Sequence, residues 1–194
     1  MHNLSGGLVL GYHGCDVKVR ERLLDGEPFK ISENEWDWLG PGAYFWEANP
    51  KRGHDFAVEL KRLGYKHARI DRPFVVGAVI NPGLCLDLTT KAGVDIVSDA
   101  HDQLTQLYEM IEEELPINSD DLLRRHLDCA VIQYVHSTRA ARNQPAIDTC
   151  RGVFIEGEPL YPTSGFYSKS HIQLAVHNLA CIKGVFRVPQ EQYE

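Results

Sequence analysis

Short β-rich runs at both ends of the chain, with helical periodicity between them, most limit how this sequence can fold. Strands are predicted for seven short runs rich in apolar and β-branched residues, at 8–14, 43–46, 74–80, 84–89, 152–159, 171–178 and 181–188. Helices are predicted where apolar residues recur at helical spacing, over 17–24, 51–67, 92–114 and 120–136. This mixture predicts an α+β fold, and the chain length is typical of a single domain over 1–194.

Local signals mark where the helices and turns begin. The expected helix caps are Asp16, Asn49 before Pro50, and the segment 118–120. The tripeptide Asn-Pro-Gly at 81–83 predicts a turn between two strands.

Composition excludes several classes of protein. The formal net charge of -7 disfavours indiscriminate binding to nucleic-acid phosphates. Five cysteines without a C-x-x-C pair argue against a disulfide framework and a zinc site, and favour a reducing compartment. The longest apolar run, 74–80, is too short to span a bilayer, and no secretory signal is visible. We therefore expect a cytoplasmic protein with no membrane partner.

Common catalytic motifs are missing as well. The segment GPGAYF lacks the third glycine of G-x-G-x-x-G, so a Rossmann site is not supported. The chain has neither a G-x-S-x-G elbow nor an H-E-x-x-H helix.

The segment DWLGPGAYFWE, residues 37–47, crowds aromatic residues around a Gly-Pro-Gly turn. Glycines that allow close backbone approach, beside aromatic faces, suit two different structures. One is the lid of a hydrophobic core, and the other is a platform on which a flat ligand stacks. Trp36, Trp38 and Trp46 are expected to pack and support rather than to touch a ligand.

Three motifs in a fixed order decide between these interpretations. They are GYHGC with His13 and Gly14, GPGAYFWE with Tyr44, and HIQLAVHNLACIKGVF near the end. Together they resemble the H-Y-E class of ADP-ribosyltransferases, the poly(ADP-ribose) polymerase and diphtheria-toxin group. That class reads HGT or HGS, then GxGIYF, then E-Y-x-x-Y-x-x-x-Q. The resemblance implies a split β-sandwich around an NAD cleft with flanking helices, in one catalytic domain.

The resemblance also implies roles for individual residues, with NAD as substrate and no metal. Gly14 would offer its backbone N–H and C=O to the nicotinamide carboxamide, and His13 would bind ribose hydroxyls. Tyr44 would stack on the nicotinamide ring. Phe56 lies one residue away from the position of the family's second aromatic residue. Taken singly, the histidine, the tyrosine and the Gly-Pro-Gly turn are also common structural features.

Gln173 departs from the family, because an ungapped overlay places it where the family has its catalytic glutamate. A neutral amide can keep a hydrogen bond to the ribose but cannot offer a negative charge to the developing cation. Transfer of a single ADP-ribose unit is therefore expected, rather than chain elongation. Strand alternation puts Gln173, Ala175 and His177 on one face, opposite Ile172, Leu174 and Val176.

Another carboxylate is a candidate for the missing charge. Glu156 and Glu158 form an E-x-E pair, as in a related transferase class, but that class adds an arginine and an S-T-S motif not found here. The pair also fits a hairpin corner. Glu47, three residues after Tyr44, is a weaker candidate.

Two functions from different classes follow. The first is a mono-ADP-ribosyltransferase, a glycosyltransferase that cleaves NAD and modifies a macromolecule, protein or nucleic acid, with the acidic balance favouring protein. Small bacterial or phage-related proteins of this class are often toxins, effectors or phage-defence components, which implies a neutralising, antitoxin-like partner. The second is a module that binds NAD or ADP-ribose without turnover. An RNA 2′-phosphotransferase with the same fold needs paired arginines, and no clear set is found.

The aromatic loop 159–170, with Tyr161, Phe166 and Tyr167, either grips the acceptor or packs as an ordinary loop.

Overall fold

The structure is a computed structural model that describes residues 2, 3, 7–64 and 70–194. Within them the fold is α+β, as predicted. The helices are α1 (Val17–Leu24), α2 (Pro50–Leu63), α3 (Lys91–Met110) and α4 (His126–Ala141). The strands are β1 (His2–Asn3), β2 (Val9–Asp16), β3 (Ala43–Glu47), β4 (Pro73–Ile80), β5 (Leu84–Asp87), β6 (Thr149–Phe154), β7 (His171–Val176) and β8 (Ile182–Arg187).

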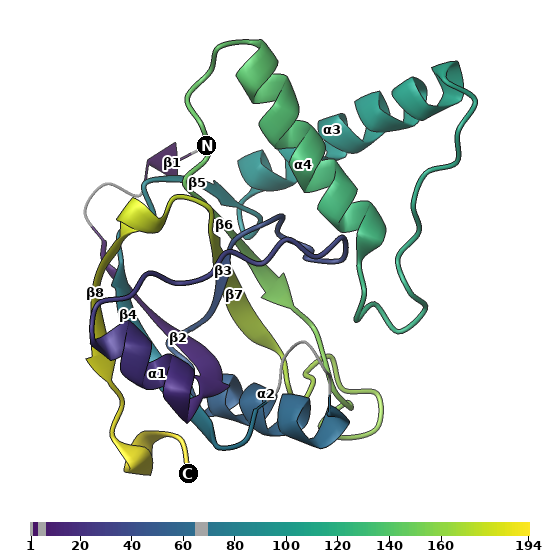
Figure 1. The fold of residues 1–194 in the computed structure, drawn as a ribbon. Coiled ribbons are helices and arrows are strands. Elements are labelled where there is room, and N and C mark those ends of the chain that lie inside the picture. The colour runs from purple at the N-terminus through teal and green to yellow at the C-terminus, as the bar shows by residue number, and fades with distance from the viewer. Residues whose placement is uncertain (1, 4–6, 65–69) are drawn as a thin grey trace.

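The strands form one mixed, open sheet in the order β1-β5-β6-β7-β3-β2-β4-β8 (Figure 1). Seven strands make up this sheet, and the two-residue β1 extends it at one edge. Neighbours are antiparallel except β5 and β6, which are parallel. The prediction of two separate facing sheets is therefore wrong for the hydrogen bonding, because the β3–β7 ladder joins both halves.

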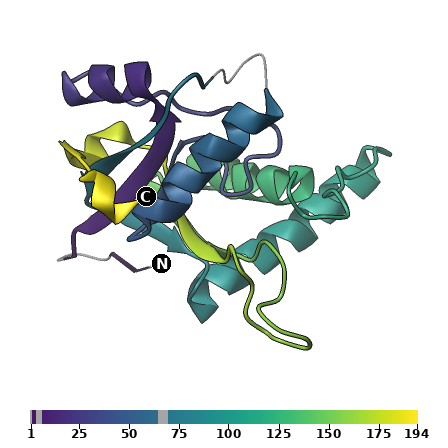
Figure 2. The ribbon, with the colours of Figure 1, turned by 90° about the horizontal axis from the view of Figure 1, so that it is seen from below.

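Helices cover both faces of this sheet. α1 packs on one face near β2, β4 and β8, and α2 runs across the other side of β2 (Figure 2). α3 and α4 pack against each other at the β5 and β6 end (Figure 1). Two main apolar clusters result, one between the sheet and the α3–α4 pair, the other on the α1 face.

The predicted caps of α1 and α2 are confirmed. The Asp16 side chain accepts a hydrogen bond from Lys18 N at 2.9 Å, and Asn49 accepts one from Arg52 N at 3.0 Å. Both bonds satisfy backbone donors that the first helical turn leaves free. α2 ends at Leu63 before a left-handed Gly64, and the rest of the predicted helix, to 67, includes residues outside the described range.

The predicted limits of the two middle helices are wrong. α3 ends at Met110 instead of 114, and α4 runs over 126–141 instead of 120–136. Asn118 does cap α4, but from a distance, since its Oδ1 accepts hydrogen bonds from Leu127 N and Asp128 N at 2.9 and 3.2 Å. The intervening residues form turns, with Leu122 at a φ of 54°.

Two further observations concern the chain as a whole. All five cysteines are free and buried. Among the helices of the described residues, none combines the length and apolar character needed to cross a membrane.

Candidate functional site

The candidate site is centred on a fork where β2 and β3 separate. The two strands pair through Gly11–Glu47 and Tyr12–Trp46, and Ala48 N donates to Leu10 O at 2.9 Å. Continued in the same register, the ladder would join Gly14 to Tyr44 by backbone hydrogen bonds. The pairing of the described strands stops before that point.

His13 takes the place of the missing ladder bond. Its Nδ1 lies 2.8 Å from the backbone oxygen of Tyr44. A carbonyl only accepts, so Nδ1 carries the proton and Nε2 is left as an acceptor. Burial lowers the pKa of His13, which keeps the imidazole neutral. The half-buried ring lies against Phe29 and Phe45, with centroids 5.4 and 5.8 Å away.

Gly14 turns its backbone edge toward this fork. Strand alternation gives Leu10, Tyr12 and Gly14 the same orientation of N–H and C=O, toward β3. The α2 side of Gly14 is closed, because an added Cβ would lie 2.9 Å from the carbonyl carbon of Gly53 and nearer still to its oxygen. Only a residue without a Cβ fits here, so the side of Gly14 that faces α2 leaves no room for a ligand.

Tyr44 lies on the opposite face of the sheet from His13. Its hydroxyl accepts a hydrogen bond from Leu39 N at 3.0 Å and donates one to Gly40 O at 2.9 Å. Burial raises the pKa of the phenol well above its usual value. The phenol therefore anchors the Gly-Pro-Gly loop, and the ring is half-buried against the α3–α4 cluster.

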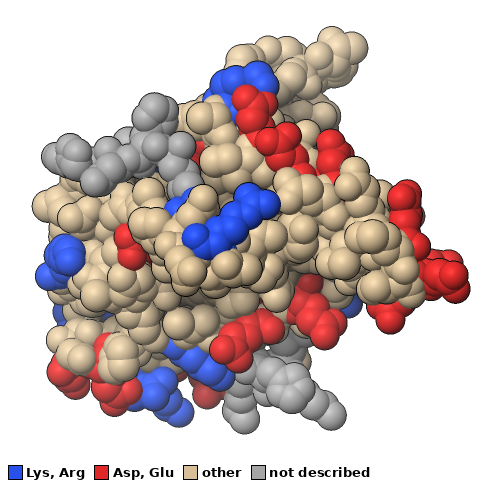
Figure 3. All heavy atoms as spheres, turned by 90° about the horizontal axis from the view of Figure 1, so that it is seen from above, with Lys and Arg blue, Asp and Glu red and all other residues tan. Residues whose placement is uncertain are grey.

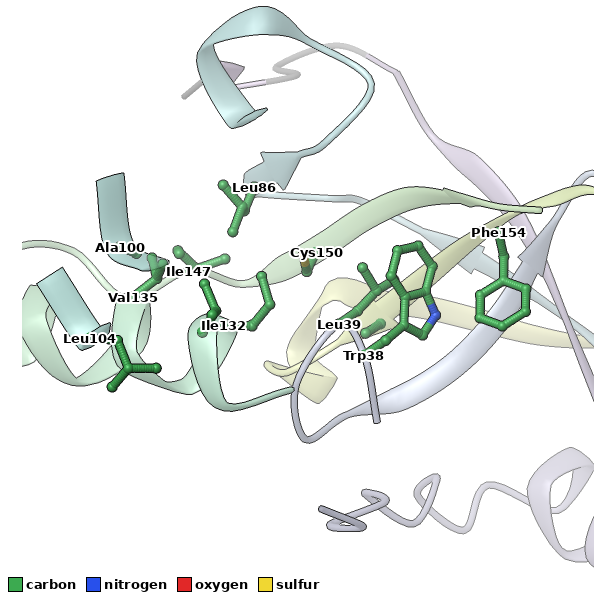
Figure 4. Close-up of a cluster of buried hydrophobic side chains, with 12 residues drawn as sticks. Trp38, Leu39, Leu86, Ala100, Leu104, Ile132, Val135, Ile147, Cys150 and Phe154 are labelled. Carbon is green, nitrogen blue, oxygen red and sulfur yellow. The ribbon is translucent and has the colours of Figure 1, made fainter. Parts of the chain in front are cut away.

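Trp38 holds Gln173 in a defined orientation. The indole Nε1 donates to Oε1 of Gln173 at 2.7 Å. The indole packs edge-on against Phe154, with centroids 5.3 Å apart, at one end of the apolar cluster (Figure 4). It lies over Gly152, the cross-strand neighbour of Gln173, where an added Cβ would meet the ring at 2.6 Å. The packing predicted for Trp38 is confirmed, and Trp46 is likewise buried, whereas Trp36 is 39% exposed, so the prediction of packing is wrong for Trp36.

The hydrogen bond from Trp38 decides what Gln173 offers to a ligand. One lone pair of its carbonyl oxygen is occupied, and one lone pair and the two amide hydrogens remain. Gln173 pairs with Trp46 on β3, and Trp46 pairs with Tyr12 on β2. At the usual strand spacing Gln173 thus lies roughly 10 Å from β2 at the fork.

Phe56 contributes an aromatic ring from α2. Its ring partner is Trp46, with centroids 4.8 Å apart. The structure therefore groups Phe56 with Trp46 and Gln173.

The three candidate carboxylates differ in their surroundings. Glu156 is held by Arg52 at 2.8 Å and Lys169 at 3.8 Å. Glu47 makes two hydrogen bonds with Arg151, at 2.6 and 2.8 Å. Glu158 is exposed in the turn after β6, where Gly157 has a φ of 87°, so the predicted hairpin corner is confirmed.

Arg52 is a residue that sequence reasoning missed. It is 6% exposed, lies in the first turn of α2, and its guanidinium carbon is 5.9 Å from the Trp46 ring. It also lies next to Gly53, which covers Gly14. One arginine three residues after an asparagine cap gives no pattern in sequence, so only the tertiary structure identifies it.

The loop between β6 and β7 forms an irregular hairpin. Leu160 N donates to Phe166 O at 2.9 Å, and Pro159 and Tyr167 form an isolated bridge. Its aromatic side chains face solvent, with Tyr161, Phe166 and Tyr167 exposed by 56%, 67% and 36%. These rings are available to a partner rather than packed in the core.

Comparison of the chain with protein-family models, curated proteins and solved structures finds no match. Among the described residues, no group of three or more His, Cys, Asp or Glu side chains could hold a metal ion.

Proposed function

We propose that the protein is a mono-ADP-ribosyltransferase that cleaves NAD at the nicotinamide–ribose bond and transfers ADP-ribose to a macromolecule. The observation that carries the proposal is the fork, where His13 replaces the Gly14–Tyr44 ladder bond. In this proposal the fork is the opening in the sheet at which NAD binds. The resemblance assigns NAD recognition to these same three residues.

The hydrogen-bonding groups at the fork match those of NAD. Gly14 directs one N–H donor and one C=O acceptor toward β3, which match the C=O and NH₂ of a carboxamide. His13, neutral and protonated on Nδ1, offers Nε2 as an acceptor for a ribose hydroxyl. In this proposal the ring of Tyr44, whose hydroxyl end is fixed, is the stacking surface and is reached from the face of the sheet opposite His13.

Gln173 suits a slow transfer of single units. Its free lone pair can accept a hydrogen bond from the ribose 2′-hydroxyl while Trp38 holds the other side of the oxygen. As the C1′–N bond breaks, positive charge develops on the ribose and electrons pass to nicotinamide. A neutral amide stabilises that charge less than a carboxylate does.

The distribution of charge leaves both acceptor classes open. Residues 92–121 contain nine of the 27 acidic residues and no lysine or arginine. The rest of the chain then has 27 − 9 = 18 acidic residues against 20 basic ones. Acidic side chains gather on the side where α3 lies (Figure 3). The global acidity therefore belongs to the α3 side and gives no preference for protein over nucleic acid at the fork.

The test is NAD labelled in the adenine, incubated with the purified protein and a cell lysate. We expect label in one macromolecular fraction as nicotinamide is released, and less label with Gln173→Ala. Gln173→Glu should raise nicotinamide release by about tenfold or more, because a carboxylate stabilises the developing cation. Gln103→Glu makes the same chemical change on the exposed side of α3 and should leave the rate unchanged.

A second candidate function is a module that binds NAD without turnover. It is favoured by the surroundings of the carboxylates, since Glu156 and Glu47 are both engaged by basic side chains. NAD that binds but stays intact with every lysate would support this module and refute the transferase. Release of nicotinamide without macromolecular label would instead indicate an NAD hydrolase.

A further inference from the structure

Besides His136 Nε2 and His177 Nε2, four buried nitrogen atoms lack a hydrogen-bond partner within the described chain. They are Trp46 Nε1, Arg52 Nε and Nη1, and His171 Nε2. Their side chains belong to residues only 3%, 6% and 6% exposed. A buried donor or acceptor left without a partner destabilises the fold, and a charged one does so more strongly. A polar group from outside the chain would remove a cost that is large compared with the net stability of a domain.

The three side chains form one cluster. The rings of Trp46 and His171 have centroids 6.0 Å apart, and the Arg52 guanidinium carbon lies 5.9 Å from the Trp46 ring. Burial, and in addition the charge of Arg52, lowers the pKa of His171. The cluster joins β3, α2 and β7 on the Gln173 face of the sheet.

The hydrogen-bonding character of the cluster is mixed. His171 Nδ1 lies 2.6 Å from Lys169 O, so Nδ1 donates and Nε2 is an acceptor. Trp46 and Arg52 contribute only donors. The cluster therefore requires a partner that accepts hydrogen bonds at one atom and donates at another.

The charges and the aromatic rings around the cluster further limit which chemical groups can bind there. The charge of Arg52 is already matched by Glu156 at 2.8 Å and Glu59 at 3.4 Å. An anion would face those carboxylates and the lone pair of His171, so a neutral group is favoured. Aromatic rings flank the cluster, with Phe56 4.8 Å from Trp46 and Phe154 stacked 5.4 Å from His171. These rings favour a planar group.

We propose that Trp46, Arg52 and His171 form a recognition site for a neutral carboxamide. Its carbonyl oxygen accepts from Trp46 and Arg52, and its N–H donates to His171 Nε2. One source is free nicotinamide released from NAD, which rests on the proposed function, since that function assigns the carboxamide of bound NAD to Gly14. The other is the side-chain amide of an asparagine or glutamine in a bound protein, which does not.

The experiment follows the tryptophan indole N–H resonances by NMR in the full-length protein. The probes are nicotinamide, N-acetylglutamine amide and, as the charged isostere, nicotinate. The resonance of Trp46 is identified with Trp46→Phe. We expect an amide probe to shift this resonance and nicotinate to bind about tenfold more weakly, and the tighter amide identifies the source.

Two variants locate the effect. His171→Phe keeps a ring against Phe154 and removes the acceptor, so amide binding should weaken about tenfold. His54→Phe is the matched control on α2, because its ring partner is Tyr193 and not the cluster. Amide binding that is equal in both variants would overturn the proposal.

The NMR titration of the wild-type protein also tests the carboxamide site without any variant. If neither amide moves the Trp46 resonance, or if nicotinate binds as well as the amides, solvent satisfies these atoms and no carboxamide site exists. This failure is separate from a failure of the proposed function, which is measured by nicotinamide release from NAD.

Discussion

Gly14→Ala tests the contact between β2 and α2 on which the geometry of the fork depends. The new methyl group would lie 2.9 Å from the carbonyl carbon of Gly53 and nearer to its oxygen, where real Cβ atoms keep at least 3.0 Å from any neighbour. The obstacle is helix backbone, so a rotamer change cannot relieve it. α2 must move away from β2, by an amount on the order of 1 Å. Overpacking of this kind costs about 1–3 kcal/mol, and a backbone obstacle places Gly14→Ala near 3 kcal/mol.

Thermal and urea unfolding followed by circular dichroism would measure this loss. For a chain of this size, about 3 kcal/mol lowers Tm by roughly 6–12 °C. Gly184→Ala is the matched control on β8, because an added Cβ there has no atom within 4 Å. A loss of stability in Gly14→Ala no larger than in Gly184→Ala would refute the packing of α2 on Gly14. It would also remove the reason for excluding a ligand from the α2 side.

Three other predictions concern side chains around the site. Tyr44→Phe leaves the buried N–H of Leu39 without its acceptor and should lower the free energy of unfolding by about 1–2 kcal/mol, measured with urea. Glu47→Gln weakens the partly buried pair with Arg151 and should cost about 2 kcal/mol by the same assay, with no change in circular dichroism at low temperature. Burial and the neighbouring charges lower the pKa of His136 from 6.5 to about 4, so its contribution is fully present above pH 6.5 and is lost as the pH falls toward 4. The loss should be about 2 kcal/mol, less than a fully buried ring would give, and His136→Gln should flatten the stability profile between these pH values.

Sequence patterns predicted the type of most elements because local chemistry decides them. Asp16 and Asn49 cap their helices by side-chain bonds within three residues, a range that a sequence pattern covers. Asn118 caps α4 through bonds to residues nine and ten positions away. A helix predicted to begin directly after this cap therefore started too early in the sequence. The turns between them depend on contacts that a periodic pattern does not contain.

The order of the strands could not be predicted, because pairing depends on distant residues. β4 and β5 are separated only by Asn81-Pro82-Gly83, yet they do not pair with each other. β4 pairs with β2 and β8, and β5 pairs with β1 and β6. At the turn, Asn81 N donates to Cys181 O at 2.9 Å and Leu84 N to Asp148 Oδ2 at 2.9 Å. These long-range bonds, and not the turn residues, direct the two strands to different parts of the sheet.

The site was predicted as a set of residues, and its geometry comes from residues that no motif contains. The sequence resemblance assigned Gln173 to the position of a catalytic glutamate, but its orientation depends on Trp38, 135 residues earlier, and on the space left by Gly152. The Trp38 indole would donate equally well to a carboxylate oxygen at position 173. Gln173→Glu therefore changes the charge of this side chain while the hydrogen bond that positions it is kept. For that reason, in the proposed reaction the ratio of nicotinamide release between the two forms measures the electrostatic contribution at this position, separated from the contribution of geometry.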